Sequence, residues 1–111
     1  MTRGEHYMER KQQLEKILEK LPDKDLVNQI IEEVIFLEKQ IEYLKTLPFI
    51  KVHPDNPQIQ KETPAAKQYH HMMQAYQNNI KLLISYIRKT DINEDTEDAF
   101  MQFVKKWGNN D

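Results

Sequence analysis

Apolar residues recur every three or four positions along four stretches of the chain, a spacing typical of amphipathic α-helices. The first stretch covers residues 5–21 and ends before Pro22, because the residue preceding a proline avoids the helical conformation. The second covers residues 23–46, and either Asp23 or Asp25 can cap its first turn. The first half of the chain is therefore predicted to form two helices.

Two further helices are predicted in the second half. Thr63 followed by Pro64 is a helix start signal, since threonine caps free N–H groups and proline suits the first helical turn. This helix should cover residues 64–90. Acidic residues begin the last helix, over residues 94–107, and Gly108 follows its end. The predicted fold is therefore a single all-α domain of four helices.

The two central helices are expected to fold back on each other as a long antiparallel hairpin that resembles a coiled coil. Each carries an apolar seam whose spacing alternates between three and four residues, as in a heptad repeat. The seam residues are Val27, Ile30, Val34, Leu37, Ile41, Leu44, Tyr69, Met73, Tyr76, Ile80, Leu83 and Ile87. The two seams match in length, which favours pairing along the whole hairpin.

The segment between these helices, residues 46–64, contains four of the five prolines, so a regular helix is excluded there. The chain has only two glycines, and the Asn-Gly turns typical of β-hairpins are missing. We therefore expect an extended, proline-rich connection, with helices as the regular structure of the chain. Residues 91–111 are expected to form an acidic linker and the short C-terminal helix.

Both central helices have more apolar surface than one facing helix can cover. On a wheel of about 100° per residue, the third helix carries a second apolar stripe roughly 80° from its seam, and the second helix has a similar excess. The candidate partner surface consists of Ile31, Ile35, Phe36, Met72, Leu82 and Tyr86. We expect a homo-oligomer that buries these residues. The alternative is a monomeric four-helix bundle in which the first and last helices cover them.

Composition limits the classes of function. The absence of cysteine excludes a disulfide framework, a thiolate metal site and a thiol nucleophile. Two glycines cannot build a Gly-rich phosphate loop. No apolar run is long enough to span a bilayer or to serve as a signal peptide. We expect a cytoplasmic protein with no cofactor, no membrane partner and no small-molecule substrate.

No set of residues has the spacing of a catalytic or metal site. Ser85, the only serine, is predicted mid-helix with no histidine within one turn. His70 and His71 point about 100° apart and cannot chelate a metal as an i, i+4 pair can. Glu38 and Glu42 share a helix face, but the Glu-x-x-His spacing of di-iron bundles is absent, and we interpret them as solvated acids. The chain is not expected to be an enzyme.

The net charge of −2 gives no global basic field, so any contact with nucleic acid must be local. Residues 64–90 contain four basic residues and no acid, whereas residues 91–98 contain five acids. A basic strip on the third helix could contact phosphates or an acidic neighbour, and the N-terminal arm could contact DNA; the alternative is a solvated face. The candidate nucleic-acid contacts are Arg3, Arg10, Lys11, Lys67, Lys81 and Arg88.

The order of these features resembles a known family. An Asp-led helix, DLVNQIIEEVIFLEKQIEYLKTL, precedes the pair Asn56-Pro57 and then the helix TPAAKQYHHMMQAYQNNIKLLISYI. Over roughly residues 23–90, this pattern is similar to the terminase small subunit of tailed phages, in the short group encoded by phages and prophages of Gram-positive bacteria. The resemblance includes the K-x-Y…Y…I-K-x-L run from Lys67 to Leu83.

The resemblance implies a non-enzymatic subunit that assembles into a ring, with the helical hairpin as the assembly element. Such a subunit recognises the packaging site on phage DNA and delivers it to the large terminase subunit, which carries the ATPase and the nuclease. The expected partners are then other copies of the chain, double-stranded DNA and the large subunit, in the cytoplasm of the host cell. The alternative from another class is a helical protein–protein interaction module, such as a regulator or adaptor, that binds no nucleic acid.

Overall fold

The computed structural model describes residues 2–90 and 94–108. The predicted all-α class is confirmed, although a small two-stranded sheet is also present. The helices are α1 (Arg3–Ile17), α2 (Lys24–Leu44), α3 (Pro64–Lys89) and α4 (Glu94–Gly108), and the strands are β1 (Ile50–Val52) and β2 (Gln60–Glu62). Within the described residues, no helix is both long and apolar enough to cross a membrane.

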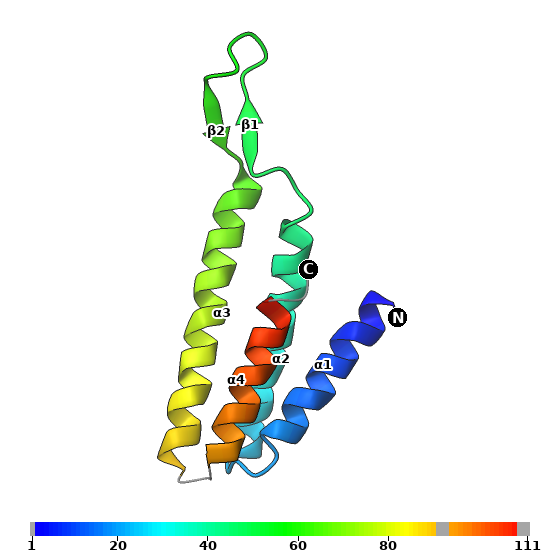
Figure 1. The fold of residues 1–111 in the computed structure, drawn as a ribbon, viewed down its shortest axis with the longest axis vertical. Coiled ribbons are helices and arrows are strands. Elements are labelled where there is room, and N and C mark those ends of the chain that lie inside the picture. Colours follow the sequence, from blue (N-terminus) through cyan, green and yellow to red (C-terminus); the bar gives the residue numbers. More distant parts are fainter. Residues whose placement is uncertain (1, 91–93, 109–111) are drawn as a thin grey trace.

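The centre of the molecule is the hairpin of α2 and α3, which run side by side in opposite directions (Figure 1). Most seam residues are buried between these helices and their neighbours, and Val34, Ile41 and Leu83 are buried completely. Tyr69 and Met73, near the start of α3, are half-buried and pack against the same core. The heptad spacing therefore identified the side on which the two long helices meet.

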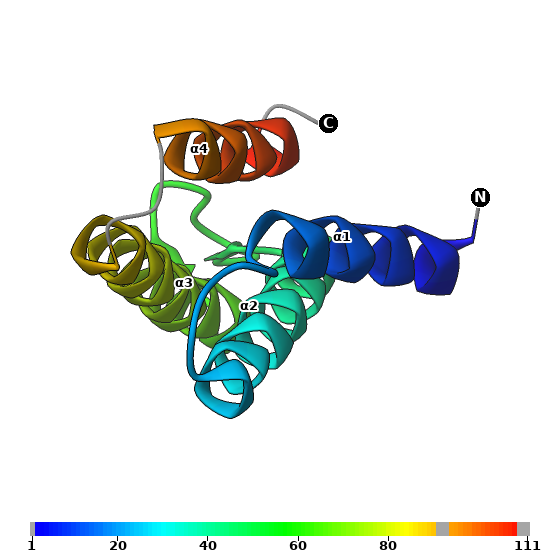
Figure 2. The same ribbon diagram turned by 90° about the horizontal axis from the view of Figure 1, so that it is seen from below.

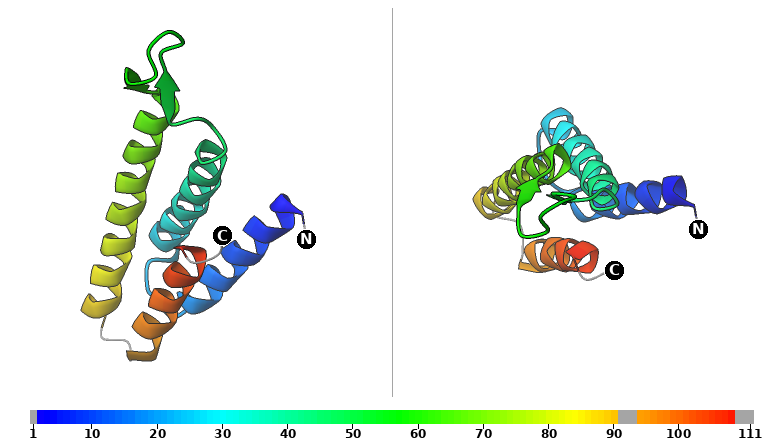
Figure 3. Two further views of the ribbon diagram at one scale, coloured as in Figure 1. Left: turned by 45° about the horizontal axis from the view of Figure 1, so that its top comes forward. Right: turned by 90° about the horizontal axis from the view of Figure 1, so that it is seen from above.

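Helices α1 and α4 cover this hairpin at the end where α2 begins and α3 finishes (Figures 2 and 3). Leu14 of α1 and Phe100 of α4 have no exposed surface and belong to the same core as the hairpin. Ile31 and Ile35 are also buried in this core, at 2% and 4% exposure, because α1 packs against α2. Their prediction as a surface for a partner chain is therefore wrong.

The other candidates for a partner surface fall into two groups. Phe36 and Leu82 are exposed, at 45% and 52%. Met72 and Tyr86 are half-buried and pack against the core, and the Tyr86 hydroxyl donates a hydrogen bond to the Pro22 carbonyl at 3.0 Å. Part of the surplus apolar surface is thus covered within one chain, as in the four-helix alternative, and part remains exposed.

The helix ends show which local signals operate. α1 begins at Arg3 because the Thr2 hydroxyl accepts a hydrogen bond from the Glu5 N–H at 3.1 Å, and it ends before the predicted position. Asp23 precedes α2 in a left-handed conformation, with φ of 56°, and its side chain makes no capping hydrogen bond, so the predicted Asp cap is wrong. The predicted cap of α3 is present, since the Thr63 hydroxyl accepts from the Ala66 N–H at 3.2 Å.

The connection between α2 and α3 is a β-hairpin that projects beyond the helices (Figure 1). The prediction of helices as the only regular structure is wrong here, because the turn is not built from Asn-Gly. Asn56 Oδ1 accepts from the Gln58 N–H at 3.2 Å, and the Asn56 carbonyl accepts from the Ile59 N–H at 2.9 Å. An asparagine that bonds the backbone two residues on, followed by a proline with fixed φ, provides a turn without glycine.

Candidate functional site

One residue from each helix contributes to a buried polar network. Arg10 of α1 donates through Nε and Nη2 to the two carboxylate oxygens of Glu38 of α2, both at 2.8 Å. The Tyr76 hydroxyl of α3 donates to the same carboxylate at 2.9 Å. Arg10 Nη1 also donates to the carbonyl of Phe103 in α4 at 3.2 Å, and its guanidinium lies 3.7 Å from the centre of that ring. This network joins α1, α2, α3 and α4.

Two predictions about these residues are therefore wrong. Arg10 is 5% exposed and cannot contact DNA phosphates, and Glu38 is 0% exposed and is not a solvated acid. The sequence contained a signal for both positions. Arg10 follows Tyr7 by three residues and precedes Leu14 by four, which is the spacing of the buried face of α1. Glu38 has the same kind of spacing in α2, four residues after Val34 and three before Ile41. Each charged residue therefore lies at a position where the helical period predicts a buried apolar residue.

A second carboxylate, one turn further along α2, also binds its neighbours. Glu42 accepts a hydrogen bond from Trp107 Nε1 at 2.8 Å and another from the Tyr7 hydroxyl. Burial, followed by this hydrogen bond, raises the pKa of the Tyr7 phenol above its ordinary range. His6 Nε2 lies 3.9 Å from Glu42. Hydrogen-bond donors from α1 and α4 thus bind the carboxylates of Glu38 and Glu42. These hydrogen bonds hold α1 and α4 against α2. In the part of the chain that the structure describes, no group of three or more His, Asp and Glu residues could hold a metal ion.

The remaining candidates for DNA contact are paired or exposed. Lys11 forms an ion pair with Glu32, and Arg88 forms one with Glu97. Arg3, Lys67 and Lys81 are exposed to solvent. Exposed ion pairs contribute little stability. The predicted basic strip is therefore partly neutralised by neighbours, and its exposed lysines on α3 are Lys67 in the first turn and Lys81 further along.

The β-hairpin carries basic residues that the sequence analysis did not single out. Lys51 and Lys61 face each other directly across the two strands, and both are exposed. Opposed residues of an antiparallel pair point to the same face, with Cβ atoms about 5 Å apart, and two like charges there are destabilising. An anion placed against both lysines would relieve this repulsion. Lys67 follows Lys61 in the sequence and lies in the first turn of α3.

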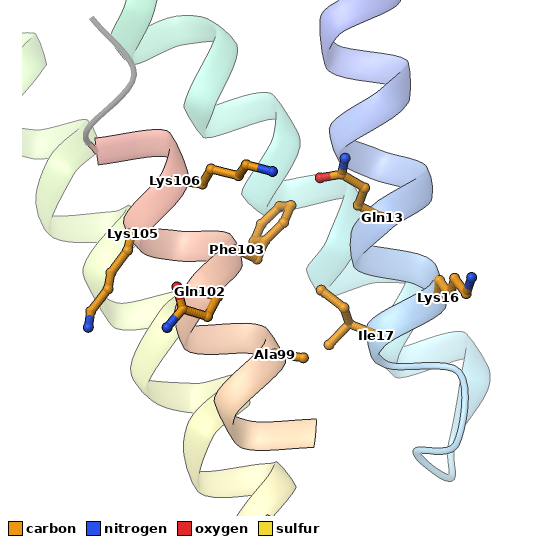
Figure 4. Close-up of a pocket in the computed structure, with 8 residues that line it drawn as sticks. All are labelled: Gln13, Lys16, Ile17, Ala99, Gln102, Phe103, Lys105 and Lys106. Carbon is orange, nitrogen blue, oxygen red and sulfur yellow. The ribbon is translucent and has the colours of Figure 1, made fainter. Parts of the chain in front are cut away.

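A further surface feature is an open groove of about 790 Å³ between α1 and α4 (Figure 4). Its apolar lining comes from Ile17, Ala99 and Phe103, and its polar lining comes from Gln13, Lys16, Gln102, Lys105 and Lys106. In Figure 4 the Lys106 side chain reaches across toward α1. None of the three lysines was a predicted site residue. The groove depends on the packing angle of α1 and α4, which spacing along the chain does not reveal.

Comparison with known proteins found no family model, no curated protein and no solved structure that matches this chain. The resemblance to the terminase small subunit therefore stays a hypothesis that rests on the pattern of residues 23–90. Two surface features are the candidates for contact with other molecules: the opposed lysines of the β-hairpin and the groove between α1 and α4.

Removal of the Glu38 carboxylate is expected to destabilise the fold strongly. A Glu38→Ala variant leaves Arg10 buried without its anionic partner, so the free energy of unfolding should fall by about 3–5 kcal/mol in urea denaturation. The matched control is Glu33→Ala, an exposed glutamate of the same helix, with an expected change within about 0.5 kcal/mol. An Arg10→Met, Glu38→Leu, Tyr76→Phe triple variant should recover most of the loss, since neither a charge nor the Tyr76 hydroxyl is then buried without its partner. Equal effects of Glu38→Ala and Glu33→Ala would contradict this role.

The network should also make stability sensitive to alkaline pH. Burial, together with the negative charge of Glu38, raises the pKa of Tyr76 above its ordinary value of about 10. As pH rises, this phenol loses its proton in the unfolded chain before it does so in the folded protein. The stability that Tyr76 gives to the fold is therefore fully present below about pH 10 and is lost as pH rises toward the folded pKa. In Tyr76→Phe, the free energy of unfolding should fall less steeply above pH 10 than in the wild type. The control, Tyr43→Phe at a 54% exposed position, should keep the wild-type slope.

Proposed function

We propose that this protein is a self-associating, DNA-binding subunit of the small-terminase type, which acts by contact with other macromolecules and not by catalysis. In this role it would bring phage DNA to a large motor subunit in the cytoplasm of the host cell. The resemblance of residues 23–90 supports the proposal. The structural observation that carries it is the opposed pair of lysines, Lys51 and Lys61, on the projecting β-hairpin.

The base of the hairpin is attached firmly to the helices. The Thr63 N–H donates to the Phe49 carbonyl at 3.1 Å, and the Thr63 hydroxyl donates to the Pro48 carbonyl at 2.6 Å. The Phe49 ring packs against Tyr69 of α3, with centroids 5.0 Å apart. Every residue of both strands is nevertheless exposed. The hairpin is thus held at its base and open to solvent along its length, which suits an element that contacts a large partner.

The two faces of the hairpin differ in chemistry. Lys51 and Lys61 occupy one face, and because side chains alternate along a strand, Ile50, Val52 and Glu62 lie on the other. A two-stranded ribbon fits the major groove of B-DNA, and lysines neutralise its phosphates. Nearby Lys67 adds a third positive charge at this end of α3. This basic face replaces Arg10 as the candidate contact for DNA.

The opposite face supports a second candidate function, the protein–protein interaction module. Ile50 and Val52 are exposed at 56% and 48%, and an isolated two-stranded hairpin is only marginally stable in water. A protein partner that covers Ile50 and Val52 would stabilise the hairpin without nucleic acid. The two candidates therefore use different faces of one element, and charge substitutions on the basic face distinguish them.

The DNA contact is tested by the double variant Lys51→Glu, Lys61→Glu in a mobility-shift titration on duplex DNA. Affinity should fall, and the dependence of log K on log salt between about 50 and 200 mM should become shallower by about two, one for each lost phosphate contact. The reason is that each lysine at a phosphate releases counterions on binding.

The matched control is Lys24→Glu, Lys89→Glu, which changes the net charge equally at the first residue of α2 and the last residue of α3. These helix ends lie opposite the β-hairpin (Figure 1). It should keep the wild-type salt dependence. Equal losses in both variants would contradict a specific role for the hairpin. No shift by the wild-type protein even at low salt would contradict DNA binding and favour the interaction module.

A further inference from the structure

The exposed face of α4 has acidic and basic residues at opposite ends. Acidic side chains occupy its first half, lysines occupy its last turn, and two uncharged residues lie between them. These exposed residues are Asp95, Asp98, Ala99, Gln102, Lys105 and Lys106. Steps of three and four residues place them along one side of the helix. The other side, with Phe100 and Phe103, is buried in the core.

We propose that two copies of this chain associate through that face, with α4 of one copy antiparallel to α4 of the other about a twofold axis. The proposal rests on the self-association part of the proposed function, and it identifies the partner of this face as a second copy. In this arrangement the same surface is used by both chains, which makes a closed, isologous contact. The assembly is then a pair and takes the place of the ring that the resemblance implies.

Charge complementarity determines the direction of the pairing. At 1.5 Å per residue, the centres of the acidic and basic pairs are separated by roughly 13–15 Å along the helix. Antiparallel pairing places Asp95 and Asp98 of each copy opposite Lys105 and Lys106 of the other. A parallel pairing would place like charges together. Near the axis, Ala99 is small and uncharged, so the two helices can approach closely.

The groove beside this face supplies the apolar part of the contact. Ile17 of α1 lines it together with Ala99 and Phe103 of α4, and Lys16 adds a positive charge from the α1 side (Figure 4). The groove continues as a hollow of about 260 Å³ toward Asp95, which shares Lys16, Ile17 and Ala99. A helix of a second copy that covers it would remove Ile17 and Ala99 from water.

The charge pattern permits a test by exchange. Mass is measured by light scattering at low salt and without DNA, where the wild type should have twice the single-chain mass of 13.4 kDa. Asp95→Lys, Asp98→Lys makes the whole face basic, and Lys105→Glu, Lys106→Glu makes it acidic. Each variant alone should have the single-chain mass. Mixed in equal amounts, the two should pair, and the quadruple variant should regain the doubled mass.

Two comparisons separate lost pairing from lost folding. Circular dichroism reports helix content, and recovery in the mixture requires that both variants are folded. The control Lys81→Glu, Lys89→Glu alters exposed lysines of α3 and should keep the doubled mass. The proposal would be overturned by a single-chain mass of the wild type at high concentration, by undiminished mass in both reversed variants, or by no recovery in the mixture and the quadruple variant.

DNA phosphates are the competing occupant of these lysines. In that case Lys105→Glu, Lys106→Glu would weaken the mobility shift of duplex DNA, the wild type would be monomeric, and the exchange variant would recover nothing. This outcome also overturns the pairing. The hairpin test is independent, since Lys51→Glu, Lys61→Glu should change DNA binding and leave the doubled mass intact. Failure of the DNA proposal and failure of the pairing are therefore distinguishable.

Discussion

The arrangement of the four helices depends on one buried ion pair, Arg10 with Glu38. Such a pair is not an obvious source of stability, because removing two charges from water is expensive and their attraction only offsets that penalty. It is effective here because Tyr76 and the Phe103 carbonyl satisfy further polar groups. No buried side-chain nitrogen or oxygen lacks a partner in residues 2–90 and 94–108. The pair therefore selects one docking position for α1 and α4, since any other would leave a charge buried alone.

This docking position gives the two ends of the molecule different surfaces. Near the starts of α2 and α4, helices α1 and α4 cover the hairpin and create the groove with Lys16, Lys105 and Lys106. Toward the other end, α2 and α3 continue into the β-hairpin, in which every strand residue is exposed. The elongated shape, with a longest extent of 60 Å, separates the proposed contact with DNA from the proposed contact between copies. Both can then be occupied at once.

Sequence patterns predicted the features that depend on neighbouring residues. The seam from Val27 to Leu44 follows from helical period, and the start of α3 follows from Thr63 and Pro64, because both are local properties. The patterns did not predict features set by packing. Arg10 and Glu38 are 28 residues apart, and nothing local states that their helices meet. Ile31 and Ile35 were correctly placed outside the seam. That α1 covers them is a tertiary contact, which the spacing of residues along α2 does not reveal. That Lys51 and Lys61 face each other follows from the register of the β-hairpin. The turn at Asn56 sets this register, and the sequence patterns did not predict that turn.

The contacts of Glu38 and Glu42 have a kinetic consequence for the groove. Its two walls, α1 and α4, are each bonded to α2 through these carboxylates, so their separation is set before any partner arrives. A preformed site loses little conformational freedom on binding and requires no opening step. The rate of association would then be governed by the encounter itself, which exposed charges accelerate and dissolved salt slows.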